Sequence, residues 1–112
     1  MKYIIPLDKV DKVVFKYLDL NLKGLEKRKP KYFKGVVFAY PNYGYGILGW
    51  KNNGTLYIYY DLINQISSTF GLYKSESQSI IGRWVSDRYQ LEVKKTHKIL
   101  YNDAKWLAID IN

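Results

Sequence analysis

Residues 45–60, YGILGWKNNGTLYIYY, contain the strongest structural signal in this amino-acid sequence. Runs of aromatic and β-branched residues, which favour strands, lie on both sides of residues 51–54. Asn53 and Gly54 both tolerate the positive φ that a tight hairpin turn requires. The stretch therefore predicts an antiparallel β-hairpin.

Alternation along the second strand of this hairpin divides its side chains between two faces. One face carries Leu56, Ile58 and Tyr60. The other face carries Tyr57 and Tyr59, so we expect a core face and a tyrosine surface. Exposed tyrosines beside lysines, with Tyr45 among them, would allow unpaired bases to stack. Coverage of the tyrosines by another element is the alternative.

Patterns upstream of the hairpin predict a helix and a strand. Apolar residues recur at helical spacing over residues 7–20, which favours an amphipathic helix. Residues 33–40 have the composition of a strand. Charged residues, Gly24 and Pro30 between them indicate a basic loop over residues 21–31.

Two further helices are expected after the hairpin. Asp61 is a suitable N-cap, and Gly71 is a suitable terminator for the first helix. Ser75 and Gln78 have the spacing of a capping box, which places the start of a second helix that ends near Arg88. Both helices carry apolar residues at helical spacing.

Two C-terminal segments alternate as strands do. These are residues 89–95 and 105–111, with a bend predicted at residues 102–103. The expected order is α-β-β-β-α-α-β-β. We therefore predict one small α+β domain over residues 1–112, with an antiparallel sheet and helices packed on one face.

The charge balance favours a polyanionic partner. The sequence contains 18 Lys and Arg residues against 10 Asp and Glu residues, a net charge of +8. One basic group comprises Lys23, Lys27, Arg28, Lys29, Lys31 and Lys34. A second comprises Arg83, Arg88, Lys94, Lys95 and Lys98. The alternative is a lysine-rich surface that serves solubility alone.

The two predicted helices resemble a helix-turn-helix. Ser67 is a small residue on the first helix, and Ser77, Ile81 and Trp84 resemble the spacing of many recognition helices. A basic hairpin after them resembles the wing of winged-helix proteins. The segment between the two helices is longer than the tight turn of a helix-turn-helix, because it includes residues 73–76. The outward-facing set is Gln78, Ser79, Arg83 and Ser86, and the expected core set is Ile80, Ile81 and Trp84.

Non-catalytic nucleic-acid binding is the function that these patterns favour. The residues expected to contact phosphates or bases are Lys27, Arg28, Lys29, Lys31, Lys34, Gln78, Ser79, Arg83, Arg88, Lys94 and Lys95. One alternative is a small protein-interaction module, an inhibitor or adaptor of the kind mobile elements encode. A small basic nuclease built from dispersed acidic residues is another. A continuous positive face would favour nucleic acid, whereas lysines scattered around an aromatic patch would favour a protein partner.

The composition contains few side chains that could bind a metal ion or a cofactor. Cysteine is absent and His97 is the single histidine, so we expect no metal and no catalytic residue. Gly44, Gly46 and Gly49 match a dinucleotide fingerprint in spacing, but they enter a hairpin strand instead of a helix, and we expect no cofactor. No apolar run is long enough to cross a membrane, and the first residues lack the apolar core of a signal peptide. We therefore expect no membrane association and a cytoplasmic location.

Overall fold

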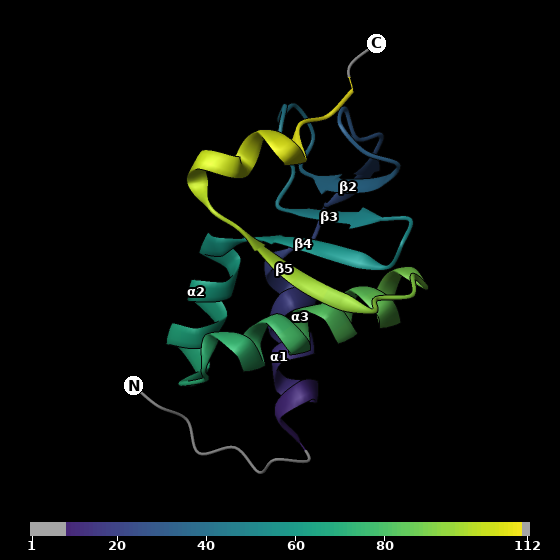
Figure 1. The fold of residues 1–112 in the computed structure, drawn as a ribbon. Coiled ribbons are helices and arrows are strands. Elements are labelled where there is room, and N and C mark those ends of the chain that lie inside the picture. The colour runs from purple at the N-terminus through teal and green to yellow at the C-terminus, as the bar shows by residue number, and fades with distance from the viewer. Residues whose placement is uncertain (1–8, 111–112) are drawn as a thin grey trace.

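Five strands lie side by side in the order in which they occur along the chain, and α-helices cover one face of the sheet (Figure 1). The structure is a computed structural model, and it describes residues 9–110. The elements are α1 (Val10–Asn21), β1 (Glu26–Arg28), β2 (Gly35–Ala39), β3 (Leu48–Lys51), β4 (Thr55–Tyr59), α2 (Tyr60–Phe70), α3 (Lys74–Tyr89), β5 (Lys95–Ile99) and the 3₁₀ helix η2 (Tyr101–Leu107). The predicted α+β class is confirmed, and the three pairs β1–β2, β2–β3 and β3–β4 are antiparallel.

The predicted hairpin is confirmed as β3 and β4. Leu48 lies opposite Ile58, and Trp50 lies opposite Leu56. The turn depends on Gly54, whose φ of 94° lies in the region that favours glycine, and its N–H donates to the Lys51 carbonyl at 2.8 Å. Local turn chemistry therefore sets the register of this pair.

The predicted loop over residues 21–31 contains an additional strand. Within it, β1 pairs antiparallel with β2 and places Lys27 opposite Phe38. Pairing with β1 satisfies the backbone groups on that side of β2, which would otherwise form an open sheet edge. Charge concealed this strand because its side chains are largely exposed.

The predicted C-terminal hairpin is wrong. Residues 90–94 have no regular structure, and β5 pairs in parallel with β4, with Tyr57 opposite His97. In the segment predicted as its partner strand, residues 105–107 form the end of η2, and two isolated bridges join Ala108 to Tyr45 and Ile109 to Pro30. Residue 111 of that prediction lies outside the described residues. The sheet is therefore mixed, and residues 90–110 form no wing.

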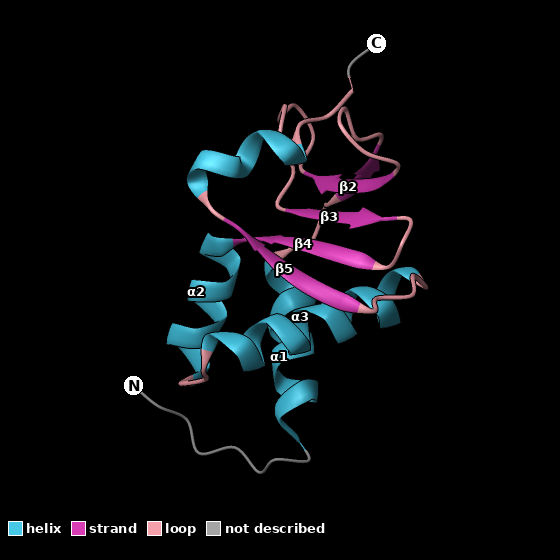
Figure 2. Ribbon diagram, in the orientation of Figure 1, coloured by secondary structure: helices cyan, strands magenta, loops and turns pink. Residues whose placement is uncertain are grey.

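The main core lies between the sheet and the α-helices, which Figure 2 shows in magenta and cyan, and it consists of apolar side chains from both. It includes Phe38, Leu48, Leu56 and Ile58 from the sheet and Val14, Leu18, Ile63, Ile66, Ile80, Ile81, Trp84 and Val85 from the helices. The predicted burial of Ile80, Ile81 and Trp84 is confirmed. Leu107 and Ile109 pack against the opposite face, close to Gly49 and Val37.

The helix ends differ in part from the prediction. Gly71 ends α2 in the left-handed conformation as expected, with φ of 65°. Asp61 lies inside the first turn of α2, and the side chain that caps α3 is Glu76, which accepts from the Tyr73 N–H at 3.0 Å. The capping box at Ser75 is therefore wrong, and only residues 71–73 connect the two helices. For α1, residues 7–8 of the predicted range lie outside the described residues.

Candidate nucleic-acid interface

A groove of about 300 Å³ lies between α3 and the start of β5. The residues that line it are Ser79, Gly82, Arg83, Ser86, Val93, Lys94, Lys95 and Thr96. Four residues predicted to contact nucleic acid, Ser79, Arg83, Lys94 and Lys95, are thus brought together from two separate segments. We call this site the α3–β5 groove.

Helical spacing and one glycine build the groove. Ser79, Arg83 and Ser86 lie three or four residues apart and so share one face of α3. Gly82 on the same helix lets β5 approach, because a Cβ there would lie 2.9 Å from Cγ2 of Thr96. Gln78, another predicted contact residue of α3, accepts from the Thr96 hydroxyl at 3.4 Å.

The turn of the β3–β4 hairpin holds the two groove lysines. The N–H of Lys94 donates to the carbonyl of Gly54 at 2.8 Å. A Cβ on Gly54 would lie 2.8 Å from Cγ of Lys94, so the lysine side chain passes directly over this glycine. Both lysines are exposed. Their ammonium groups are thus available to an anion.

Arg83 is outward-facing as predicted, and it is also paired. Its Nε and Nη2 donate to the two carboxylate oxygens of Asp11 on α1, at 2.7 and 2.9 Å. These hydrogen bonds from Arg83 lower the pKa of the Asp11 carboxyl. Asp11 offsets the guanidinium charge, which leaves Lys94 and Lys95 as the main cationic groups of the groove.

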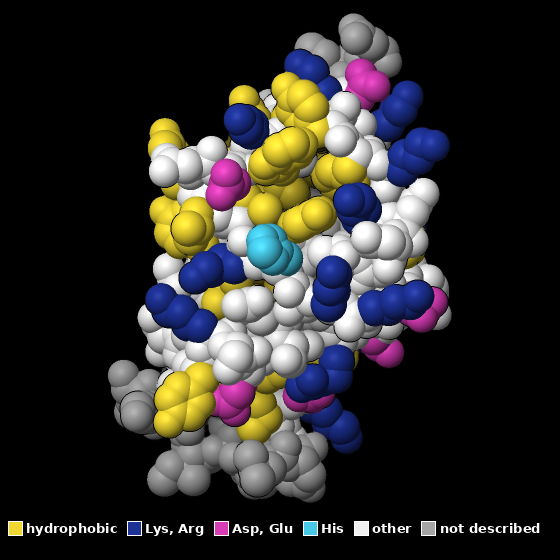
Figure 3. Space-filling model, viewed as in Figure 1, with side chains coloured by type: hydrophobic (Ala, Val, Ile, Leu, Met, Phe, Trp, Pro, Cys, Tyr) yellow, Lys and Arg dark blue, Asp and Glu magenta, His cyan; other side chains and the backbone are white. Residues whose placement is uncertain are grey.

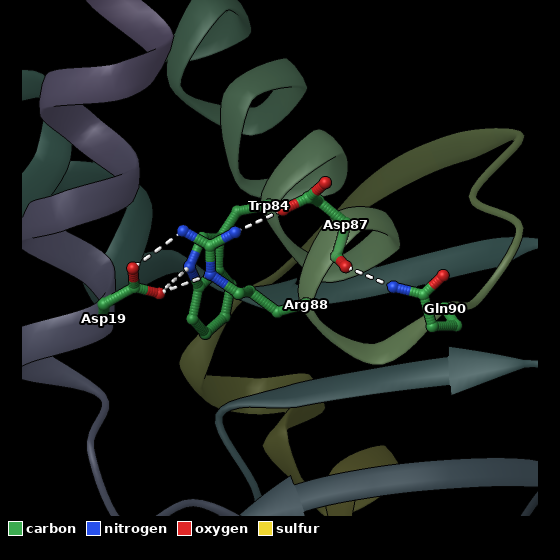
Figure 4. Close-up of polar contacts among 5 residues, drawn as sticks. All are labelled: Asp19, Trp84, Asp87, Arg88 and Gln90. Atoms are coloured by element: carbon green, nitrogen blue, oxygen red, sulfur yellow. Dashed lines mark hydrogen bonds and ion pairs between the residues drawn. The ribbon is translucent and has the colours of Figure 1, made fainter.

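Arg88 binds a second carboxylate of α1 and does not line the groove (Figure 4). Its Nε and Nη2 donate to Asp19 at 2.8 and 2.7 Å, and it forms an ion pair with Asp87. Asp19 also accepts from Nε1 of Trp84 at 2.8 Å. Hydrogen bonds from Arg88 and then Trp84 lower the pKa of Asp19. Arg88 thus joins α1 to α3.

The predicted basic residues of β1 and its end contact other parts of the chain. Nζ of Lys27 lies 5.7 Å from the ring centroid of Tyr89, a cation–π distance. Nζ of Lys29 lies 3.5 Å from the carboxylate of Asp110. Arg28 is half-buried. None of these residues lines the α3–β5 groove.

Lys31 and Lys34 belong to the segment that leads into β2. Nζ of Lys31 is 5.5 Å from the ring centroid of Tyr32. The carbonyl of Lys34 accepts from the N–H of Asn52 at 3.0 Å, so Lys34 lies beside the β3–β4 turn. Neither lines the groove, and both are exposed.

A second hollow, of about 400 Å³, lies on the sheet face opposite the α-helices. Its lining residues are Tyr32, Phe33, Lys51, Tyr57, His97, Ile99, Asp103 and Trp106. We call it the aromatic pocket. Figure 3 shows it as a hydrophobic patch, with His97 in cyan at its lower edge and Lys and Arg side chains around it.

Sequence reasoning identified only part of this aromatic surface. Tyr57 lines the pocket as the expected tyrosine face suggested. Tyr59 and Tyr45 line a separate hollow beside η2, together with Tyr101. Trp106 was missed because it was assigned to a strand. The high aromatic content was the available signal, but it gave no positions.

Within residues 9–110, no group of three or more His, Asp or Glu side chains is placed to hold a metal ion. Likewise, no helix of the described part of the chain has the length and apolar character needed to cross a membrane. Comparison with protein-family models, curated proteins and solved structures finds no match to this chain.

Proposed function

We propose that this protein binds nucleic acid without catalysing a reaction on it, and that the α3–β5 groove holds the phosphates. The observation that carries the proposal is the meeting of Ser79, Arg83, Lys94 and Lys95 around one hollow. These residues come from a helix and from a strand start that are separated in the sequence. The net charge of +8 favours the same class of ligand.

The groove supplies the groups that phosphate contacts use. Lys94 and Lys95 are flexible point charges, and Ser79 and Ser86 carry hydroxyl donors. Arg83 is fixed in orientation by Asp11, which leaves its remaining N–H donors in a defined place. Such contacts bind phosphates of any sequence, so the proposal does not include recognition of particular bases at this site.

The proposed mode differs from that of a winged helix. The lysines near β5 belong to a strand of the sheet and its approach, so they do not form a protruding wing. Within α3, Gln78 contacts Thr96, and Arg83 and Arg88 contact α1. Because these side chains of α3 already contact β5 and α1, contact with phosphates is favoured over insertion of α3 into a major groove.

Removal of the two groove lysines tests the proposal. Lys94→Ala combined with Lys95→Ala should weaken binding to labelled nucleic acid and reduce the slope of log affinity against log salt by about 1 for each phosphate that is no longer neutralised. Fluorescence anisotropy at several salt concentrations measures both quantities. Both side chains are exposed, so the fold should persist.

Lys12→Ala combined with Lys16→Ala is the matched control. It removes the same charge from exposed positions of α1 that do not line the groove. Equal loss of affinity in the two double variants would mean that only net charge matters and would remove the groove from the proposal. If the unaltered protein binds no nucleic acid at low salt, the function itself is wrong.

A protein partner is the second candidate, and the aromatic patch of Figure 3 favours it. Trp106 and Tyr101 are 46% and 74% exposed, and large exposed aromatic side chains are frequent anchors of protein interfaces. In this view, basic side chains are scattered around the patch and do not merge into one positive surface. Pull-down of a protein that competes with nucleic acid for the same surface would support this candidate.

A further inference from the structure

We propose that the aromatic pocket holds an unpaired base, so that single-stranded nucleic acid is the preferred ligand over duplex. This inference rests on the nucleic-acid binding proposed above and specifies its substrate class. In a duplex, the faces of the bases are stacked on one another, and only their edges are available in the grooves. A ring-lined hollow can accept a base only if that base is free to leave its stack.

Five rings line the pocket, and several touch one another. The ring centroids of Tyr57 and His97 are 5.8 Å apart, and those of Phe33 and Tyr57 are 5.9 Å apart. Tyr32 and Trp106 form another pair at 5.7 Å with an interplanar angle of 75°. Neighbouring rings are therefore edge to face and are not stacked on each other.

The two outer rings are open to a ligand. Tyr32 is 50% exposed and Trp106 is 46% exposed. Their edge-to-face contact restrains both side chains, so a base that stacks on either ring would meet a surface already ordered. Phe33 and Tyr57 are half-buried and form the floor. At about 400 Å³, the hollow has the size of a small-ligand pocket.

Polar groups at the pocket match those that read the edges of a base. Lys51 is a donor, the Asp103 carboxylate is an acceptor, and His97 carries ring nitrogens. Exocyclic amino groups and carbonyl oxygens of an unpaired base require both kinds of partner. A carboxylate inside a site for phosphate alone would be unfavourable, so Asp103 favours a base over a phosphate here.

β5 connects the pocket with the groove. Lys95 borders the groove and His97 borders the pocket, and the two residues are only two apart on β5. Lys31, Lys51 and Lys95 therefore lie around or beside the rings and offer cations to the backbone of a strand whose base occupies the pocket. The phosphates of such a strand would gain from these charges, whereas a neutral apolar peptide would not.

Substitution at Trp106 tests this inference. Trp106→Ala should weaken binding of a short single-stranded homopolymer about 5- to 100-fold, because stacking on an aromatic side chain is lost. Trp106→Phe keeps a ring and should retain most of the affinity. Tyr43→Ala is the matched control, since Tyr43 is 64% exposed and does not line the pocket. Circular dichroism checks the fold, and Tyr32→Ala is the second variant if Trp106→Ala does not fold.

An abasic strand of the same length provides the sharper comparison, because it keeps the phosphates and removes the bases. It should bind the unaltered protein as weakly as the intact strand binds Trp106→Ala, and Trp106→Ala should weaken it no further. Intact strand should also quench the fluorescence of Trp106, the only exposed tryptophan within residues 9–110.

The outcomes separate this inference from the proposed function. If intact and abasic strands bind equally well, or if duplex binds as tightly as single strand, the pocket holds no base, while phosphate binding at the groove stands. If Trp106→Ala binds single strands as tightly as the unaltered protein does, the pocket does not bind a base, and a protein partner remains its candidate ligand. If the protein binds no nucleic acid at all, both proposals fall together.

Discussion

Two aspartates on the same helix, α1, differ in how much each contributes to the stability of the fold. Asp11 and Asp19 each accept two hydrogen bonds from an arginine of α3. Asp19 alone also accepts from the indole N–H of Trp84, a side chain only 3% exposed. Loss of Asp19 therefore leaves a donor in the core without its partner, whereas loss of Asp11 breaks only an exposed ion pair.

Alanine substitution at these two positions should give unequal effects. Asp19→Ala should lower the free energy of unfolding by about 1 to 3 kcal/mol, the cost of leaving the nearly buried Trp84 donor unpaired. Asp11→Ala should lower it by about 0 to 1 kcal/mol, as for a surface ion pair. Urea denaturation of both variants measures the difference. Equal losses would mean that the bond to Trp84 contributes nothing to stability.

Sequence patterns predict which residues are buried but not which polar partners they find. Helical spacing placed Trp84 on the inner face of its helix, and it is buried. The same spacing turned Arg83 outward, but it could not indicate Asp11, because the two residues lie in helices distant in the sequence. The spacing of Ser79 and Arg83 indicated their shared face, whereas their meeting with Lys94 needed the position of β5.

At the scale of elements, the outcome depended on whether the hydrogen-bond partner was local. The β3–β4 hairpin was predictable because its turn residues and its alternation belong to one short stretch. The alternation of Leu91 and Val93 marks real contacts with the core, but their segment forms no strand, and the strand begins at Lys95. The parallel partner of β5 is β4, which lies far from it in the sequence, so no pattern near β5 could indicate this pairing.

The contact between α3 and β5 provides a test at this scale. Gly82→Val should lower the free energy of unfolding by about 1 to 3 kcal/mol, since added atoms would overlap Thr96 and push β5 from the helix. Gly44→Val is the control, because nothing lies within 4 Å of a Cβ at Gly44. Thermal melts compare the variants. A melt unchanged by Gly82→Val would show that β5 moves aside without cost.

At the scale of the molecule, the excess of positive charge makes the stability of the fold depend on its carboxylates staying ionised. Ten Asp and Glu side chains oppose 18 Lys and Arg side chains, so protonation of the carboxylates in acid leaves the basic groups unopposed. The carboxyls of Asp11 and Asp19 have a lowered pKa, in each case chiefly because an arginine donates hydrogen bonds to the carboxylate. Their contribution to the free energy of unfolding should be lost in acid.

Stability should decline as the pH falls below about 4. The two carboxyls have their ordinary pKa of 3.8 in the unfolded chain and a lower pKa in the folded chain. The unfolded state therefore binds more protons in this window, and the stabilisation that is complete above the unfolded pKa is lost as the pH falls through the folded pKa. Thermal melts across this range measure the decline.

A variant carrying both Asp11→Asn and Asp19→Asn is the control for the acid effect. It should be less stable than the unaltered protein near neutral pH and should show a shallower decline in acid, because the two titrating groups are gone. Parallel pH profiles for the two proteins would place the acid sensitivity in other carboxylates.

The position of β5 has a consequence for the order in which the chain folds. Hairpins such as β3–β4 form within about 1 to 10 μs, whereas β5 can pair with β4 only after α2 and α3 have brought it back to the sheet. Because β5 borders both the groove and the pocket, an intermediate that has the hairpin but not the docked strand contains neither surface. A ligand held by both surfaces therefore binds the completed fold alone, and by mass action it lowers the population of molecules in which β5 is undocked.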